Sequence, residues 1–84
     1  MKTAYIVQTF TRQGNAQSSK LFNDPAVQCN TAEEAMNRAE RFSEMRAGVL
    51  AISQAYDETT GDYGEMKVLA HYGEIPEGAL GYDD

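Results

Sequence analysis

The stretch YDETTGDYGE, residues 56–65, combines four acids with two threonines and two glycines, and such residues can bind calcium. An EF-hand loop requires oxygen ligands at its positions 1, 3, 5 and 12 and glycine at position 6. A loop that starts at Asp57 would have Gly61 at position 5, Asp62 at position 6 and Val68 at position 12. The spacing therefore excludes an EF-hand.

Two other interpretations of this stretch stay open. Asp57, Asp62 and Glu65 could form a looser metal site, or the whole stretch could be the turn of a hairpin. Aspartate, threonine and glycine supply the side-chain hydrogen bonds and positive φ angles that turns require. We predict a hairpin turn, and we expect no metal ion and no cofactor.

Cys29 and His71 are the only cysteine and the only histidine, and they are the candidates for nucleophilic catalysis. Cys29 stands just before a predicted helix, a place that can lower the pKa of a thiol. No second cysteine and no family-specific spacing accompanies it, so we predict a small buried cysteine and an exposed or half-exposed histidine on a strand. The chain also lacks a P-loop and the C-x-x-C and H-E-x-x-H motifs, so we predict no catalysis.

The charges of the chain are unevenly distributed. Residues 1–56 hold six basic and five acidic residues, whereas residues 57–84 hold one basic and eight acidic residues, which gives the net charge of −6. Arg38, Arg41 and Arg46 alternate with glutamates, a pattern typical of a salt-bridged face in water rather than a phosphate site. Because nucleic-acid binding needs a basic surface, we expect no nucleic-acid partner.

Length and composition predict one globular domain in the cytoplasm. The chain has 84 residues, of which 42% are hydrophobic, too many for intrinsic disorder. The apolar segment AYIV ends at Gln8, well short of a signal peptide, and no segment approaches the roughly 20 apolar residues that span a bilayer. A single cysteine excludes an internal disulfide and suits a reducing compartment. We expect no membrane partner.

Four segments are predicted as strands because they are rich in β-branched and aromatic residues. They are residues 4–12, 20–29, 48–56 and 65–73. Pro25 interrupts the second segment and cannot donate a backbone hydrogen bond, which places this strand at a sheet edge or gives it a bulge.

The helix is predicted over residues 32–46. Thr31 and Glu34 form the capping box T-x-x-E, in which each side chain satisfies a backbone N–H at the start of the helix. Glu34 and Arg38 are spaced as a favourable i,i+4 ion pair. Gly48 suits the left-handed position that follows a helix.

The resulting pattern is ββαββ, and the fold class is α+β. We predict a four-stranded antiparallel sheet of order 2-1-3-4 with the helix packed on one face. Residues 1–75 form the single domain, and residues 76–84 form a flexible acidic tail.

Alternation along the strands divides the apolar residues of the sheet into two sets. One set, predicted to face the helix, is Ile6, Phe10, Leu50, Ile52, Met66 and Val68. The other set is Tyr5, Val7, Val49, Ala51 and Leu69. Because a contiguous exposed apolar patch marks an interaction site, this second set is the candidate interaction surface. The alternative is that the tail folds back through Ile75 and Leu80 and covers it.

Three segments together resemble a group of short, uncharacterised single-domain bacterial proteins. The segments are AYIVQTF, TAEEAMNRAERFSEMRAGVLA and TGDYGEMKVLAHYGEIP, and they span nearly the whole chain. The resemblance implies one small domain in a bacterial cytoplasm. It implies no activity, cofactor or catalytic residue.

Two classes of function remain. The sequence favours a small acidic protein that acts by protein–protein interaction, either as a homodimer or with a partner protein. The alternative is a small-molecule-binding or enzyme-accessory domain that uses the open face of the sheet.

The turn interpretation of residues 57–65 predicts that the protein folds without a metal ion. EDTA should therefore leave the melting temperature, followed by circular dichroism, unchanged. A large fall in the melting temperature that added calcium reverses would instead establish a metal site.

Overall fold

The computed structural model describes residues 1–14 and 19–76, which form one helix and five strands. In chain order the elements are β1 (Lys2–Gln13), β2 (Lys20–Asn23), β3 (Val27–Cys29), α1 (Ala32–Phe42), β4 (Gly48–Tyr56) and β5 (Tyr63–Gly73). Of the predicted acidic tail, residues 76–84, only Pro76 lies within the described residues.

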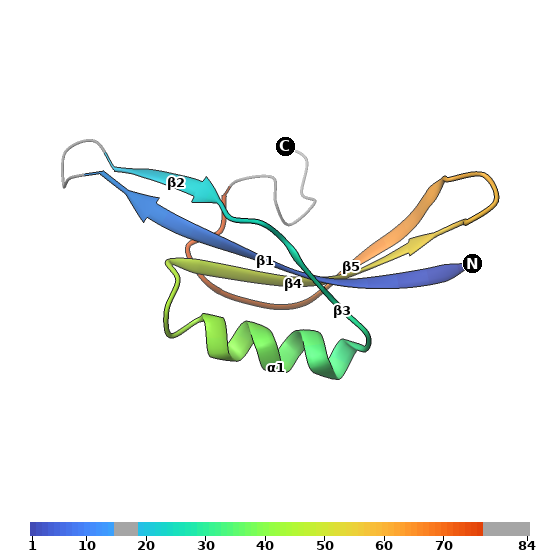
Figure 1. Cartoon of the computed structure of the whole chain (residues 1–84), viewed down its shortest axis with the longest axis horizontal. Coiled ribbons are helices and arrows are strands. Elements are labelled where there is room, and N and C mark those ends of the chain that lie inside the picture. Colours follow the sequence, from blue (N-terminus) through green and yellow to red (C-terminus); the bar gives the residue numbers. More distant parts are fainter. Residues whose placement is uncertain (15–18, 77–84) are drawn as a thin grey trace.

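The strands form one antiparallel sheet of order β2-β1-β4-β5, and β3 also pairs with β1. The predicted α+β class and strand order are confirmed, and α1 lies along one face of the sheet (Figure 1). β2 and β3 pair with different parts of β1, and Pro25 lies between them. The predicted edge position is confirmed, but the single predicted strand over residues 20–29 is two strands, so the sheet has five strands rather than four. Proline cannot donate to the ladder there.

The start of α1 follows the capping signal in the sequence. The Thr31 hydroxyl accepts a hydrogen bond from the Glu34 backbone N–H at 3.0 Å. The Glu34 carboxylate reaches back to the backbone N–H of Asn30 at 2.9 Å, one residue before the position that a standard capping box uses. Glu34 also pairs with Arg38 at 3.4 Å, as the i,i+4 spacing predicts.

The end of α1 differs from the prediction. The helix stops at Phe42, whose carbonyl accepts from the backbone N–H groups of Met45 and Arg46 in a tight turn. Gly48 does not adopt a left-handed conformation and instead begins β4. Glycine is required there for another reason: a Cβ atom on Gly48 would lie 1.7 Å from the Glu74 carbonyl oxygen.

The core lies between α1 and the sheet. Its fully buried members are Val7, Cys29, Ala35, Ala39, Val49 and Ala51. The buried residues of the helix are alanines, which let its backbone approach the sheet closely, and Phe42 at its end packs partly buried against the same cluster. An 11-residue helix is about 16 Å long, whereas the 12 residues of β1 extend about 40 Å, so α1 covers only part of the sheet's length.

Across residues 1–14 and 19–76, the structure has no helix with the length and apolar character needed to cross a bilayer.

The capping geometry predicts the effect of Thr31→Ala. This substitution removes the hydroxyl that accepts from the Glu34 N–H, and it should lower the free energy of unfolding by about 1 kcal/mol. Urea denaturation of the two proteins measures the difference. An unchanged midpoint would show that the cap does not stabilise α1.

Candidate functional site

The structure places the predicted interaction surface in the core instead. Val7, Val49 and Ala51 are 0% exposed and belong to the cluster that packs against α1. Tyr5 and Leu69 are partly buried against the same cluster. The prediction that these five residues form an exposed interaction surface is therefore wrong.

The error concerns which face the helix covers, not which residues share a face. Residues directly opposite each other on antiparallel strands point to the same side. Val7 lies opposite Ala51, and Ile6 lies opposite Ile52, so the two predicted sets are separated correctly in these rows. The connection β3–α1–β4 places the helix over the row of small residues, where Ala35 and Ala39 can pack closely.

The face opposite α1 is here called the open face, and its residues follow from the strand register. They include Lys2, Ala4, Ile6, Gln8 and Phe10 on β1, Leu50, Ile52, Gln54 and Tyr56 on β4, and Tyr63, Met66, Val68 and His71 on β5. One apolar row, Ile6–Ile52–Val68, runs across the three strands. Val68 is 37% exposed, and Tyr63 is 79% exposed.

At one end of the open face the apolar side chains are buried rather than exposed. By register, Phe10 and Leu50 share the side opposite α1, yet they are only 2% and 4% exposed. At this end Glu74 leaves β5 and makes a two-pronged ion pair with Arg12, both N–O distances being 2.9 Å. This pairing lowers the pKa of the Glu74 carboxyl and raises that of Arg12. The accessible part of the open face is therefore nearer the β4–β5 turn.

The alternative prediction is that the tail folds back through Ile75 and Leu80 and covers the open face. Only the first of these two residues lies within the described part of the chain. Ile75 is half-buried, and Leu80 lies outside the described residues.

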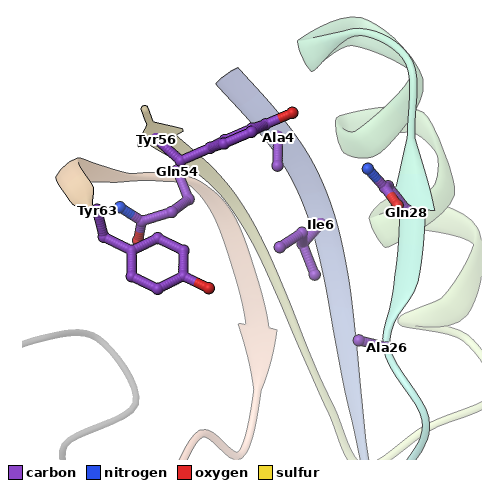
Figure 2. Close-up of a pocket in the computed structure, with 7 residues that line it drawn as sticks. All are labelled: Ala4, Ile6, Ala26, Gln28, Gln54, Tyr56 and Tyr63. Carbon is purple, nitrogen blue, oxygen red and sulfur yellow. The ribbon is translucent and has the colours of Figure 1, made fainter. Parts of the chain in front are cut away.

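A hollow of about 390 Å³ lies on the accessible part of the open face (Figure 2). It is lined by Ala4, Ile6, Ala26, Gln28, Gln54, Tyr56 and Tyr63. In Figure 2 the two tyrosines and Gln54 stand on the side of the β4–β5 hairpin, and Gln28 and Ala26 stand across β1 from them, with Ile6 between. The lining contains no charged side chain.

The two tyrosines are placed by the hairpin. Tyr56 and Tyr63 are the last paired residues before the turn, so they share one face. The Asp57 carboxylate accepts from the backbone N–H groups of Thr59 and Thr60 at 2.8 and 3.4 Å, which fixes the turn. The acidic stretch is therefore a hairpin turn, as predicted.

Gln54 is held between these strands by its amide nitrogen. The Nε2 atom donates to the backbone carbonyls of Ala55 and Gly64 at 3.1 and 2.9 Å. Because a carbonyl can only accept, these two bonds fix which end of the side chain is nitrogen. The oxygen is therefore the acceptor end of the Gln54 side chain, which is one of the residues that line the hollow.

The opposite rim depends on the link between β2 and β3. The Asp24 carboxylate accepts from the hydroxyls of Thr11 and Thr9 at 2.7 and 2.9 Å, and the Asp24 carbonyl accepts from Gln8. These hydrogen bonds, that from Thr11 first, lower the pKa of the Asp24 carboxyl, and the charge of Arg46 acts in the same direction. The network holds the segment that leads to Ala26 and Gln28.

The candidate catalytic residues lie apart. Cys29 is buried on the helix side, where burial above all raises the pKa of its thiol, and His71 is exposed on the open face. Cys29 is therefore the buried residue that the sequence predicts. In residues 1–14 and 19–76, no three or more His, Cys, Asp or Glu side chains form a group that could hold a metal ion.

The arginines of the helix region also differ in their environment. Arg38 pairs with Glu34, as expected for a salt-bridged face. Arg38 and Arg41 line a smaller hollow of about 290 Å³ with Phe42 and Met45, and Arg46 lies near Asp24.

Comparison with known proteins gives no relative: no family model, no curated protein and no solved structure matches this chain.

Sequence reasoning missed Tyr56, Tyr63 and Gln54 as site residues. The signal was present, because the two tyrosines flank the acidic turn symmetrically and a hairpin must pair them. Gln28 and Ala26 carry no comparable signal, because only the tertiary structure brings β3 beside this part of β1.

The lowered pKa of Asp24 predicts a pH-dependent stability. The ionised carboxylate stabilises the fold above the pKa of an unfolded aspartate, about 3.9, and this contribution is lost as the pH falls through the lower folded pKa. Asp24→Asn should therefore be less stable than the parent protein at neutral pH, and the difference should shrink as the pH falls below about 3.9 and through the folded pKa of Asp24. Urea midpoints measured across this range test it, and a difference independent of pH would contradict the assignment.

Proposed function

We propose that this protein acts by binding another protein through the open face, in the cytoplasm and without catalysis. The observation that carries the proposal is the apolar row Ile6–Ile52–Val68, in which Ile6 and Ile52 are half-buried and Val68 is 37% exposed, on the same face as the exposed side chain of Tyr63. An antiparallel sheet that faces water normally presents polar side chains on that side. A contiguous apolar row in this position is typical of an interaction site.

The shape of the hollow favours a protein over a small molecule. Its volume of about 390 Å³ falls within the range of ligand pockets, which supports a small-molecule-binding or enzyme-accessory domain as the second candidate. However, every lining residue belongs to the sheet or to the link before β3. A ligand would be covered from one side only, whereas ligand pockets bury most of their ligand. A partner protein would itself cover the other side of the hollow.

The partner is either a second copy or a different protein. The net charge of −6 opposes close approach of two copies and also weighs against a nucleic-acid partner. Edge strand β5 and the open face are both available to a second copy in the described part of the chain. A different protein with a basic surface meets no such repulsion.

The environment of Cys29 agrees with this proposal. Its buried thiol has a raised pKa and is the only one in the chain, so it offers neither a disulfide nor a ready nucleophile. A reducing compartment suits such a residue.

Site-specific photo-crosslinking in the native host tests the proposal. The crosslinking amino acid p-benzoylphenylalanine replaces Val68 on the open face or Met36 on α1. These positions are a matched pair, because their side chains are 37% and 39% exposed. We expect discrete protein adducts from position 68 and none from position 36.

A second substitution controls for random collision. Ile6→Lys, introduced together with the crosslinker at position 68, adds a charge to the same apolar row and should abolish the adducts. Equal adducts from both positions, or none from position 68, would reject binding through the open face.

A further inference from the structure

We propose that the hollow between Tyr56, Tyr63 and Ile6 binds the guanidinium group of an arginine on the partner protein. This inference rests on the proposed function, because it assigns the chemistry of the partner at the same face. Three independent features of the hollow support it: its aromatic walls, its acceptor oxygen and the charge around it.

The aromatic walls favour a cation. Tyr56 and Tyr63 both project from the open face, and Tyr63 is 79% exposed, so its ring is available to a ligand. The face of an aromatic ring is electron-rich and attracts a cation placed above it. Ile6 and Ala4 complete an apolar floor that suits the carbon chain of a long basic side chain.

The acceptor oxygen favours a hydrogen-bond donor. Both N–H groups of the Gln54 amide can be used by the carbonyls of Ala55 and Gly64, so the group that remains for a ligand is the oxygen. In Figure 2 the Gln54 side chain lies between the two tyrosines. A ligand that donates a hydrogen bond to this oxygen and stacks on a tyrosine ring would use both features.

The surrounding charge selects a positive ligand. Asp57 and Asp62 adjoin the two tyrosines in sequence, within the distance of about 8–10 Å over which charges act at physiological salt. Lys2, opposite Tyr56, is paired with Glu58 at 2.8 Å. In residues 1–14 and 19–76, neither Asp57 nor Asp62 forms a salt bridge. A basic partner is therefore attracted.

Arginine fits these features better than lysine does. A guanidinium group is planar, stacks on aromatic rings and carries five N–H donors in its plane. It can stack on a tyrosine while it donates to the Gln54 oxygen. An ammonium group is more strongly hydrated and loses more on entering an apolar hollow.

Titration of the full chain, labelled with ¹⁵N, by two short peptides tests the inference. One is a capped glycine–serine–arginine–serine–glycine peptide, and the other has citrulline, which is neutral and nearly isosteric, in place of arginine. We expect the arginine peptide to shift the signals of Tyr56, Tyr63 and the Gln54 side-chain amide and to bind at least threefold more tightly. Higher salt should weaken its binding.

Substitutions of exposed tyrosines separate stacking from simple contact. Tyr63→Leu should weaken binding of the arginine peptide by about 2- to 30-fold, and Tyr63→Phe should retain it. Tyr72→Leu is the matched control, because Tyr72 lies on the same strand but pairs with Val49 on the helix side. It should leave the affinity unchanged.

Four outcomes would overturn the inference. No binding of the arginine peptide, or equal binding of the two peptides, would reject a guanidinium group as the ligand. Tighter binding of tetramethylammonium would indicate a site for a small organic cation. The fourth is a concentration-dependent shift of the same signals without peptide, which would make a second copy the occupant. Adducts from position 68 would still uphold the proposed function in these cases, whereas their absence would reject that function itself.

Discussion

The close packing of an alanine-faced helix against small residues of the sheet is the constraint on which the rest of the structure depends. Ala35 and Ala39 allow α1 to lie directly over Val7, Val49 and Ala51, all of them fully buried. Larger residues at these positions would lift the helix from the sheet. Because the chain has one helix in its described residues, this choice leaves the larger apolar residues, including Ile6 and Ile52, on the other face.

Polar contacts then hold the segments at the two edges of the hollow on this face. At one side Asp24 ties the link between β2 and β3 to the threonines of β1. At the other side Asp57 organises the turn, and Gln54 joins the two strands of the hairpin. Both networks are built from side chains that bond to neighbouring backbone or hydroxyl groups, so the rims of the hollow are held without a ligand.

The uneven charge distribution of the sequence places acidic residues beside the hollow. The acidic half of the sequence includes the turn beside the tyrosines, while the closed end of the same face carries the Arg12–Glu74 pair. An apolar hollow beside an acidic turn provides contact area and long-range attraction together. These properties suit recognition of a basic protein segment and are the physical basis of the proposed function.

The sequence by itself determined the kinds of element, their order and the sets of residues that share a face, but it placed the end of the helix four residues too late and predicted one strand where β2 and β3 lie. The signals for these are local: alternation along a strand, the capping residues Thr31 and Glu34, and turn formers around Gly61. Only the tertiary structure decided which set the helix covers, because alternation is the same for both faces and the choice depends on how the chain crosses over β1. The requirement for glycine at position 48 and the contribution of β3 to the hollow also come from the tertiary structure. Both depend on contacts between segments far apart in the chain.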